Sequence, residues 1–263
     1  MTRFNSSIAR EVFPCRWKQT RIISLKKCAT PRQPKDFRPI AILCFLSKVL
    51  EKIAHDQLQE YITSKKLLDP MQTGFRKNHS TQTAVLKLTD DIRSGLDRKL
   101  VTLLLLFDFR KAFDTISPSK LLARLKSMEF SRAALGWINS YSSGRKQMVS
   151  THLKEESNWL TTNLGVPQGS VLGPLLFCLY INNIRDTLDP CFVEYILYAD
   201  DLQIYNQVPY EHLNEDIRIM QRAARAVSGW AVDASLTLNA SKTKMIIFGS
   251  SRFIDDSYAG EPR

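Results

Sequence analysis

The feature that most constrains this chain is a pair of adjacent carboxylates, Asp200 and Asp201, set between two apolar runs. The runs span 192–197 and 202–205 and are rich in the aromatic and aliphatic residues typical of strands. Two such runs around a short polar segment predict a β-hairpin that presents both acidic side chains at its turn. Like charges held this close repel each other, more strongly in the low dielectric of a folded protein. A divalent cation offsets the repulsion, and Mg²⁺ prefers oxygen ligands of this kind.

Two other Asp-Asp pairs show that such a pair is a weak signal by itself. Asp90 and Asp91 lie in a helical pattern, where charged side chains usually form a solvated face. Asp255 and Asp256 lie in a polar stretch at the C-terminal end. The strands on either side are therefore what distinguishes the third pair.

A second apolar run, 100–107, ends in Asp108. A run so uniformly apolar predicts a strand covered on both faces. A carboxylate that follows it is costly to bury, so we expect Asp108 at the open end of the strand with a partner. If this strand and the hairpin are neighbours in one sheet, three carboxylates meet at one edge. Such a set can hold two Mg²⁺ ions about 3.5–4 Å apart for in-line phosphoryl transfer.

The remaining periodicity predicts an α+β fold. Ser80 or Thr81 is expected to cap a helix, and Pro118 is expected in the first turn of another. Segment 165–170 contains Gly165 and Gly169 and predicts a tight loop that exposes its main chain. The other expected helices lie within 1–14, 46–62, 131–141, 174–185 and 213–230, and the other expected strands are 20–25, 147–149 paired with 159–162, and one within 236–249.

Charge and cysteine content narrow the class of partner and compartment. The 263 residues carry a net charge of +11, and the pI is about 9.5. Residues 1–38 hold ten Lys or Arg and two acidic residues, which favours a polyanionic partner and nucleic acid before membrane. The N-terminus lacks a signal-peptide pattern, and the longest aliphatic stretch, 103–106, is too short to span a bilayer. Five scattered cysteines match no zinc spacing and fit a reducing compartment, with nucleus or cytoplasm left open.

Three segments together resemble a known family. Residues 107–114, 165–174 and 198–201 resemble motifs A, B and C of reverse transcriptases, most closely those of jockey- and CR1-like non-LTR retrotransposons. Residues 38–40, 72–81 and 238–243 match further blocks of that family in the same order, so the resemblance covers roughly 10–249. It implies a nucleotidyltransferase that adds dNTPs to a DNA primer 3′-hydroxyl on an RNA template, using two Mg²⁺ ions with Mn²⁺ as the alternative.

The resemblance also implies a role for each matching residue. Asp108, Asp200 and Asp201 correspond to metal ligands, and the backbone carbonyl of Phe109 to a further one. Phe113 corresponds to the aromatic gate that rejects a ribose 2′-hydroxyl. Further roles are implied for Arg76 in gripping the incoming triphosphate with help from Lys26 or Lys27, for Gln168 and Gly169 in shaping the pocket around the nascent base pair, and for Lys242 in protonating the departing pyrophosphate.

The implied architecture is a right-hand polymerase with an antiparallel palm sheet backed by helices, plus fingers. A thumb is expected to be largely missing, as are other domains of a retrotransposon polyprotein such as an endonuclease. The expected divisions are a reverse transcriptase domain over 1–250, with fingers 1–97 and 120–160 and palm 98–119 and 161–249, followed by a polar tail 251–263.

Two alternatives stay open from the residues. One is a retrotransposon remnant that binds nucleic acid without catalysis, and the other is a protein like a group II intron maturase. The chain departs from the family where Asn182-Asn183 replaces the usual Asn-Asp, and where Met128-Glu129-Phe130 replaces the usual Gly-Phe. All three Asp residues of the expected site are intact, which argues against the remnant.

Overall fold

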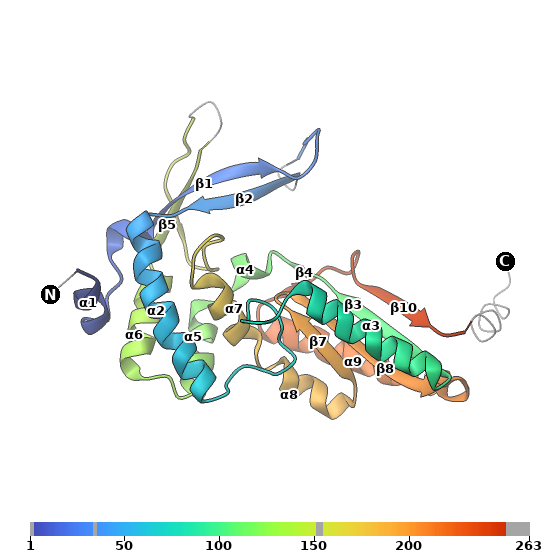
Figure 1. Ribbon diagram of the computed structural model, residues 1–263. Helices are drawn as coiled ribbons and strands as arrows, with labels where there is room; N and C mark the ends of the chain where they lie inside the picture. Colours follow the sequence, from blue (N-terminus) through green and yellow to red (C-terminus); the bar gives the residue numbers. More distant parts are fainter. Residues whose placement is uncertain (1–2, 34–35, 151–154, 251–263) are drawn as a thin grey trace. The chain divides into compact units, whose positions relative to one another are not determined.

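The computed structural model describes residues 3–33, 36–150 and 155–250, which divide into two compact units (Figure 1). The first unit comprises Met1–Leu68 and Phe113–Tyr180, and the second comprises Asp69–Ala112 and Ile181–Arg263. Each unit is therefore built from two separated parts of the chain.

The first unit contains a mixed sheet with strand order β2-β1-β5-β6. Strands β1 (Gln19–Lys26) and β2 (Phe37–Ile42) are antiparallel, whereas β1 and β5 (Arg145–Ser150) are parallel. The predicted pairing near residue 160 is confirmed, because β6 (Leu160–Thr162) runs antiparallel to β5.

Helices of the first unit begin where sequence signals place them. Pro118 occupies the first turn of α5, and the Ser131 hydroxyl caps α6 by accepting from the backbone N–H of Ala134 at 3.2 Å. Phe13 packs edge-on against Trp137 and Tyr141 of α6, with ring centroids 5.6 and 5.1 Å away. The helices are α1 (Arg3–Ala9), the 3-10 helix η1 (Cys15–Lys18), α2 (Phe45–Ser64), α5 (Pro118–Ser127), α6 (Arg132–Ser142) and α7 (Gly173–Ile181), with α4 (Ala112–Thr115) at the passage between units.

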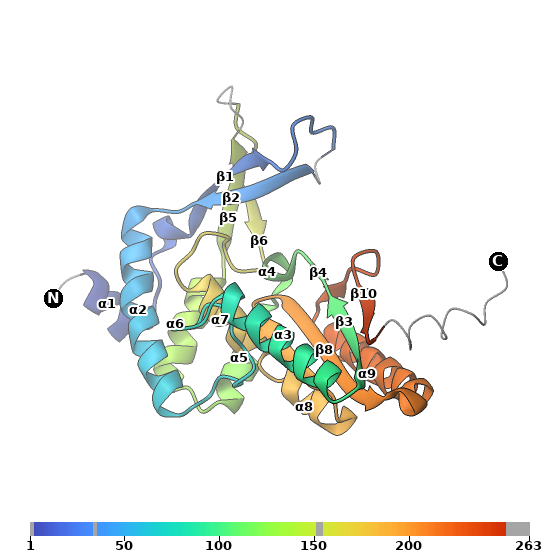
Figure 2. The same ribbon diagram turned by 45° about the vertical axis from the view of Figure 1, so that its right-hand side comes forward.

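The second unit is organised around an antiparallel sheet with strand order β10-β3-β8-β7, which confirms the predicted antiparallel palm-like sheet. Helix α3 (Thr81–Asp97) covers one face and α9 (Leu213–Asp233) covers the other (Figures 1 and 2). Side chains alternate along a strand, so consecutive residues of β8 reach different helices. Tyr205 contacts Asp91 of α3, and Asn206 contacts Asp216 of α9. The strands are β3 (Leu100–Phe107), β7 (Glu194–Tyr198), β8 (Asp201–Pro209) and β10 (Lys244–Phe248).

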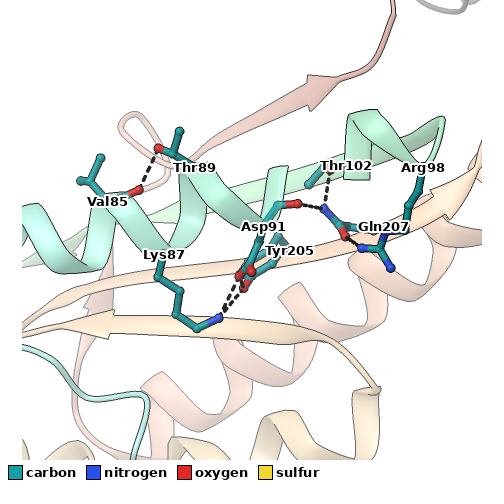
Figure 3. Close-up of polar contacts among 8 residues, drawn as sticks. All are labelled: Val85, Lys87, Thr89, Asp91, Arg98, Thr102, Tyr205 and Gln207. Atoms are coloured by element: carbon teal, nitrogen blue, oxygen red, sulfur yellow. Dashed lines mark hydrogen bonds and ion pairs between the residues drawn. The ribbon is translucent and has the colours of Figure 1, made fainter. Parts of the chain in front are cut away.

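Polar contacts hold α3 on the sheet (Figure 3). The Asp91 carboxylate accepts from Lys87 and from the Tyr205 hydroxyl. The expectation of a solvated face is therefore half right, because Asp90 is exposed whereas Asp91 is partly buried in these contacts. The Gln207 amide donates to the backbone oxygen of Asp91 at 2.7 Å and to the Thr102 hydroxyl at 3.1 Å. Burial and then the neighbouring Asp91 raise the pKa of Tyr205, so its hydroxyl keeps its proton and remains a donor.

Short elements complete the second unit. Strands β4 (Phe109–Arg110) and β9 (Thr237–Leu238) form a two-stranded sheet of their own. The helix expected over 174–185 is interrupted, because α7 ends at Ile181 and α8 (Ile184–Leu188) follows Asn182-Asn183. Both Asn side chains bond elsewhere: Asn182 accepts from the backbone N–H of Asp69, and Asn183 accepts from the Trp230 indole. The 3-10 helices η3 (Asp189–Cys191) and η4 (Tyr210–His212) flank the hairpin.

No helix in the described part of the chain is long and apolar enough to cross a lipid bilayer. The predicted polar tail, 251–263, lies outside the described residues, and the pair Asp255 and Asp256 lies there with it.

Two helical glycines of the second unit give a matched test of this packing. A methyl group at Gly229 in α9 would meet nothing within 4 Å, so Gly229→Ala should raise the free energy of unfolding by about 0.5–1 kcal/mol. A methyl group at Gly95 in α3 would lie 2.5 Å from the Gln207 amide nitrogen and would displace it from its partners. Gly95→Ala should therefore be the less stable variant by about 1 kcal/mol in urea unfolding. An equal increase in the free energy of unfolding for the two variants would contradict the described packing of α3 against Gln207.

Candidate active site

The register of β3 on β8 determines which acidic residues become neighbours. Phe107 pairs with Leu202, and continuing that antiparallel register by one residue sets Asp108 against Asp201. Tyr198 pairs with Asp201, so only Ala199 and Asp200 form the turn between β7 and β8. The expectation that both carboxylates lie in the turn is therefore half right, because Asp201 is already the first residue of β8.

The electrostatics of the pair match crowded like charges. Burial is the main cause that raises the pKa of Asp200, and the Asp108 carboxylate adds to it. Burial, then Asp200, then Asp108 raise the pKa of Asp201, while Lys242 lowers the pKa of both. Each of the two carboxylates therefore lies within the field of Asp108.

Asp108 is held by a turn that the sequence analysis did not single out for this purpose. The Asn239 side chain donates to one carboxylate oxygen of Asp108 at 2.7 Å, and the Asn239 backbone N–H donates to the Asp108 carbonyl at 2.8 Å. Lys242 lies with its Nζ 3.4 Å from the other carboxylate oxygen. The signal available beforehand was an Asn directly after a short apolar segment, a residue type that bonds nearby main chain in turns.

Asp108, Asp201 and Gln203 line a pocket of ≈ 470 Å³. Two lysines from the C-terminal turn and strand, Lys242 and Lys244, line the same pocket. The remaining lining residues are Leu106, Phe107, Leu202 and Ser241. The pocket thus combines acidic groups suited to a cation with ammonium groups suited to an anion.

The donor set fits a hard divalent cation, because carboxylate oxygens are the ligands that Mg²⁺ prefers. Within residues 3–33, 36–150 and 155–250, no three His, Cys, Asp or Glu side chains stand together as a ready-made metal cage. Asp108, Asp200 and Asp201 thus form no such cage by themselves, although the Asp108 charge acts on both of the other carboxylates. Phe109 is buried with its ring 6.1 Å from that of Trp230, and the ligand role of its carbonyl stays a prediction.

Arg76 lies in the second unit and bonds its own loop. Its Nη1 donates to the backbone oxygens of Asp69, Pro70 and Gln72 at 3.2, 3.5 and 3.3 Å. A guanidinium carries five N–H donors, so these bonds leave capacity for a phosphate. Its predicted grip on a triphosphate stays a prediction.

Phe113, Gln168 and Gly169 belong to the first unit, where they lie on neighbouring segments. The Phe113 ring stacks on Phe177 of α7 with centroids 4.5 Å apart. Its carbonyl accepts from Val166 at 2.9 Å, and the Gln168 amide donates to Asp114 at 2.9 Å.

The glycines of this loop are required by its conformation. Gly165 has φ of +82°, and a side chain there would lie 2.8 Å from the Asp114 carbonyl oxygen. Gly169 has φ of +99°. The predicted tight loop is confirmed, and the close approach at Gly165 is made by the chain's own backbone.

Charge removal at the carboxylates tests these electrostatics. A raised pKa means that ionisation of Asp201 destabilises the folded state once the pH exceeds the ordinary Asp value. Asp201→Asn should therefore raise the melting temperature at pH 7 in EDTA. Mn²⁺ should stabilise the original protein more than the variant, because a ligand that binds the folded state raises its stability. Asp90→Asn, on the exposed side of α3, is the control and should change neither value. A lower melting temperature for Asp201→Asn would contradict the described charge crowding.

Comparison with known proteins identifies the family to which this chain is similar. The family model described as reverse transcriptase (RNA-dependent DNA polymerase) matches residues 25–256. The probable RNA-directed DNA polymerase from transposon BS of Drosophila melanogaster is 30% identical over 246 residues, covering 91% of this chain and 27% of that protein. The RNA-directed DNA polymerase from mobile element jockey of the same species is 26% identical over 253 residues, covering 94% and 27%. The chain thus spans about a quarter of the length of these relatives.

Solved structures agree on the fold. Apo telomerase from Candida tropicalis, truncated from its C-terminal domain, superimposes with a TM-score of 0.63 at 14% identity, covering 91% of this chain and 52% of that one. Telomerase from Candida albicans, in complex with the TWJ fragment of telomeric RNA, gives a TM-score of 0.58 at 13% identity, covering 94% and 46%. Such low identity shows the polymerase fold alone. With the family match over most of its length, this chain belongs to the reverse transcriptase (RNA-dependent DNA polymerase) family.

Proposed function

We propose that this chain catalyses RNA-directed DNA synthesis, transferring deoxynucleotides from dNTPs to a primer 3′-hydroxyl on an RNA template. The observation that carries the proposal is the sheet edge of the second unit, where Asp108 and Asp201 line one pocket and the Asp108 charge acts on both Asp200 and Asp201. Positioned carboxylates of this kind suit phosphoryl transfer, because the catalysis is mostly electrostatic.

Asp108, Asp200 and Asp201 would hold two Mg²⁺ ions, or Mn²⁺ in their place. When bound, the ions activate the 3′-hydroxyl and neutralise charge on the leaving pyrophosphate. Asn239 keeps the Asp108 carboxylate oriented through its 2.7 Å bond. Lys242, 3.4 Å from Asp108 and largely exposed, would donate a proton to the departing pyrophosphate.

The remaining predicted residues take roles in selecting the nucleotide. Phe113 would exclude a ribose 2′-hydroxyl, and Arg76 would bind the triphosphate. Gln168 and Gly169 would shape the pocket around the new base pair, and the Asp114 contact holds the Gln168 amide for this. The proposed division keeps fingers at 1–97 and 120–160 and palm at 98–119 and 161–249.

The basic composition supports a nucleic-acid partner. A net charge of +11 favours binding to template and primer phosphates, and such binding weakens steeply with salt. Among the relatives, a type-1 retrotransposable element R2 protein of Popillia japonica is named a Pol polyprotein, and this chain covers 33% of it. We infer that this chain works as one part of a longer retrotransposon protein.

Primer extension tests the proposal directly. With the chain in excess over a primed RNA template, addition of one dNTP should require Mg²⁺ or Mn²⁺ and should stop in EDTA. Asp200→Ala should reduce the rate by at least about a thousandfold, because a preorganised charge is lost from the reacting centre. Asp90→Ala removes an exposed carboxylate of α3 and should leave the rate unchanged. Excess chain keeps duplex binding from limiting the result, so failure to add even one nucleotide would contradict the proposal.

Sugar discrimination tests Phe113 separately. Phe113→Val should raise the efficiency of rNTP addition relative to dNTP by about tenfold or more, the scale of one steric contact in a pocket. Phe130→Val is the control, because Phe130 is also in the first unit but packs against Tyr61 at 5.0 Å. It should lower stability without altering the ratio. An unchanged ratio for Phe113→Val would remove Phe113 from the role of gate.

A further inference from the structure

The outer edge of the second unit's sheet is covered by a segment outside its named strands. Strand β7 is the last in the order β10-β3-β8-β7, and residues 71–73 pair along its free side. The Leu197 N–H donates to the Met71 carbonyl at 3.0 Å, and the Thr73 N–H donates to the Leu197 carbonyl at 2.7 Å. The segment ends beside the turn that carries Asp200.

Gln72 is the buried centre of this contact, with 1% of its surface exposed. Its side-chain oxygen accepts from the backbone N–H of Gly74 at 2.8 Å and from that of Ala199 at 3.2 Å. Both partners are donors, so the oxygen of the amide must face them. The amide nitrogen has no hydrogen-bond partner among the described residues, so the Gln72 side chain acts here only as a hydrogen-bond acceptor.

The turn has a particular need for that acceptor. Ala199 is buried and has φ of +54°, a left-handed conformation that is strained for a residue other than glycine. An unpaired buried N–H would add a further cost, because the group would have lost its hydrogen bonds to water without a replacement. The Gln72 oxygen removes this second cost and so favours the conformation from which Asp200 and Asp201 follow.

Gly74 allows the backbone of residues 72–74 to lie close to the backbone of Ala199. A side chain at Gly74 would lie 2.1 Å from the Ala199 nitrogen, so the two backbones touch. Arg76, two residues later, donates to the Gln72 carbonyl at 3.3 Å. Gln72 therefore contacts the acidic turn through its side chain and Arg76 through its backbone carbonyl.

We propose that Gln72 is a positioning residue that fixes the Asp200-Asp201 turn and couples it to the loop carrying Arg76. In the proposed function, on which this inference rests, the metal-holding turn and the triphosphate-binding loop then keep one relative placement. Gln72 touches neither substrate nor ion and acts through the main chain of Ala199.

Amide hydrogen exchange followed by NMR tests the contact itself. Gln72→Met keeps the side-chain length but removes the acceptor, so the Ala199 amide should exchange about tenfold faster, the scale of one hydrogen bond. The Leu197 amide, bonded to the Met71 backbone, is the internal control and should keep its rate. An unchanged Ala199 rate in the Met variant, or equal acceleration at Leu197, would overturn the proposal.

Mn²⁺ affinity, measured by electron paramagnetic resonance, tests the effect on the turn. Gln72→Met should weaken binding by about tenfold, whereas unchanged affinity would overturn the positioning role. Neither measurement needs nucleotide transfer, so a failure of the Gln72 proposal can be distinguished from a failure of the proposed polymerase function. A chain that adds no nucleotide but shows both effects retains Gln72 as the positioning residue without the polymerase function. A chain that polymerises but shows neither effect retains the function without Gln72.

Discussion

The antiparallel pairing of β3 with β8 is the constraint on which the second unit depends. It pairs Phe107 with Leu202 and so brings Asp108 next to Asp201. A slip of one residue would turn every side chain of a strand to the other face of the sheet. Tyr205 would then leave α3, Asn206 would leave α9, and the acidic edge would not form. The helices that cover both faces thus hold the register that places the carboxylates.

Several unfavourable features gather at this edge and are offset by neighbours. Burial and like charge raise the pKa of Asp200 and Asp201, and Lys242 opposes both effects. Ala199 adopts a left-handed backbone, which the surrounding contacts must maintain. Perturbed ionisation and strained backbone occurring together are typical of functional sites, where geometry is kept at the expense of local stability.

In each unit a buried side-chain acceptor holds the main chain of a loop that carries proposed site residues. In the first unit Glu51 is fully buried, and its carboxylate accepts from the backbone N–H groups of Val171 and Leu172 at 2.8 and 3.3 Å, just after Gln168 and Gly169. Burial, and then the Glu51 charge, raises the pKa of Tyr141, whose hydroxyl also donates to Glu51. In the second unit Gln72 does the same for Ala199. Both are polar residues on segments distant in sequence from the loops they hold.

The local elements and the acidic set could be predicted from the sequence alone. Alternation predicted β1, a uniformly apolar run predicted β3, and helical periodicity predicted α2 and α9. A hydroxyl residue correctly marked the start of α3 and of α6. Such signals are readable because they arise between residues a few positions apart. Asp108 was found because it directly follows an apolar run, and Asp200 and Asp201 were found because they form a pair between two such runs.

The side chains that hold these Asp residues in place, by contrast, depend on how remote segments pack in the fold. Asn239 reaches Asp108 across 131 positions, Gln72 reaches Ala199 across 127, and Asn182 breaks a predicted helix to bond Asp69 across 113. These bonds join a side chain to a group from a remote segment, so they leave no periodic pattern near either partner. Whether a polar residue lies on a solvated face or in such a bond depends on what the fold packs against it, as Asp91 against Tyr205 shows.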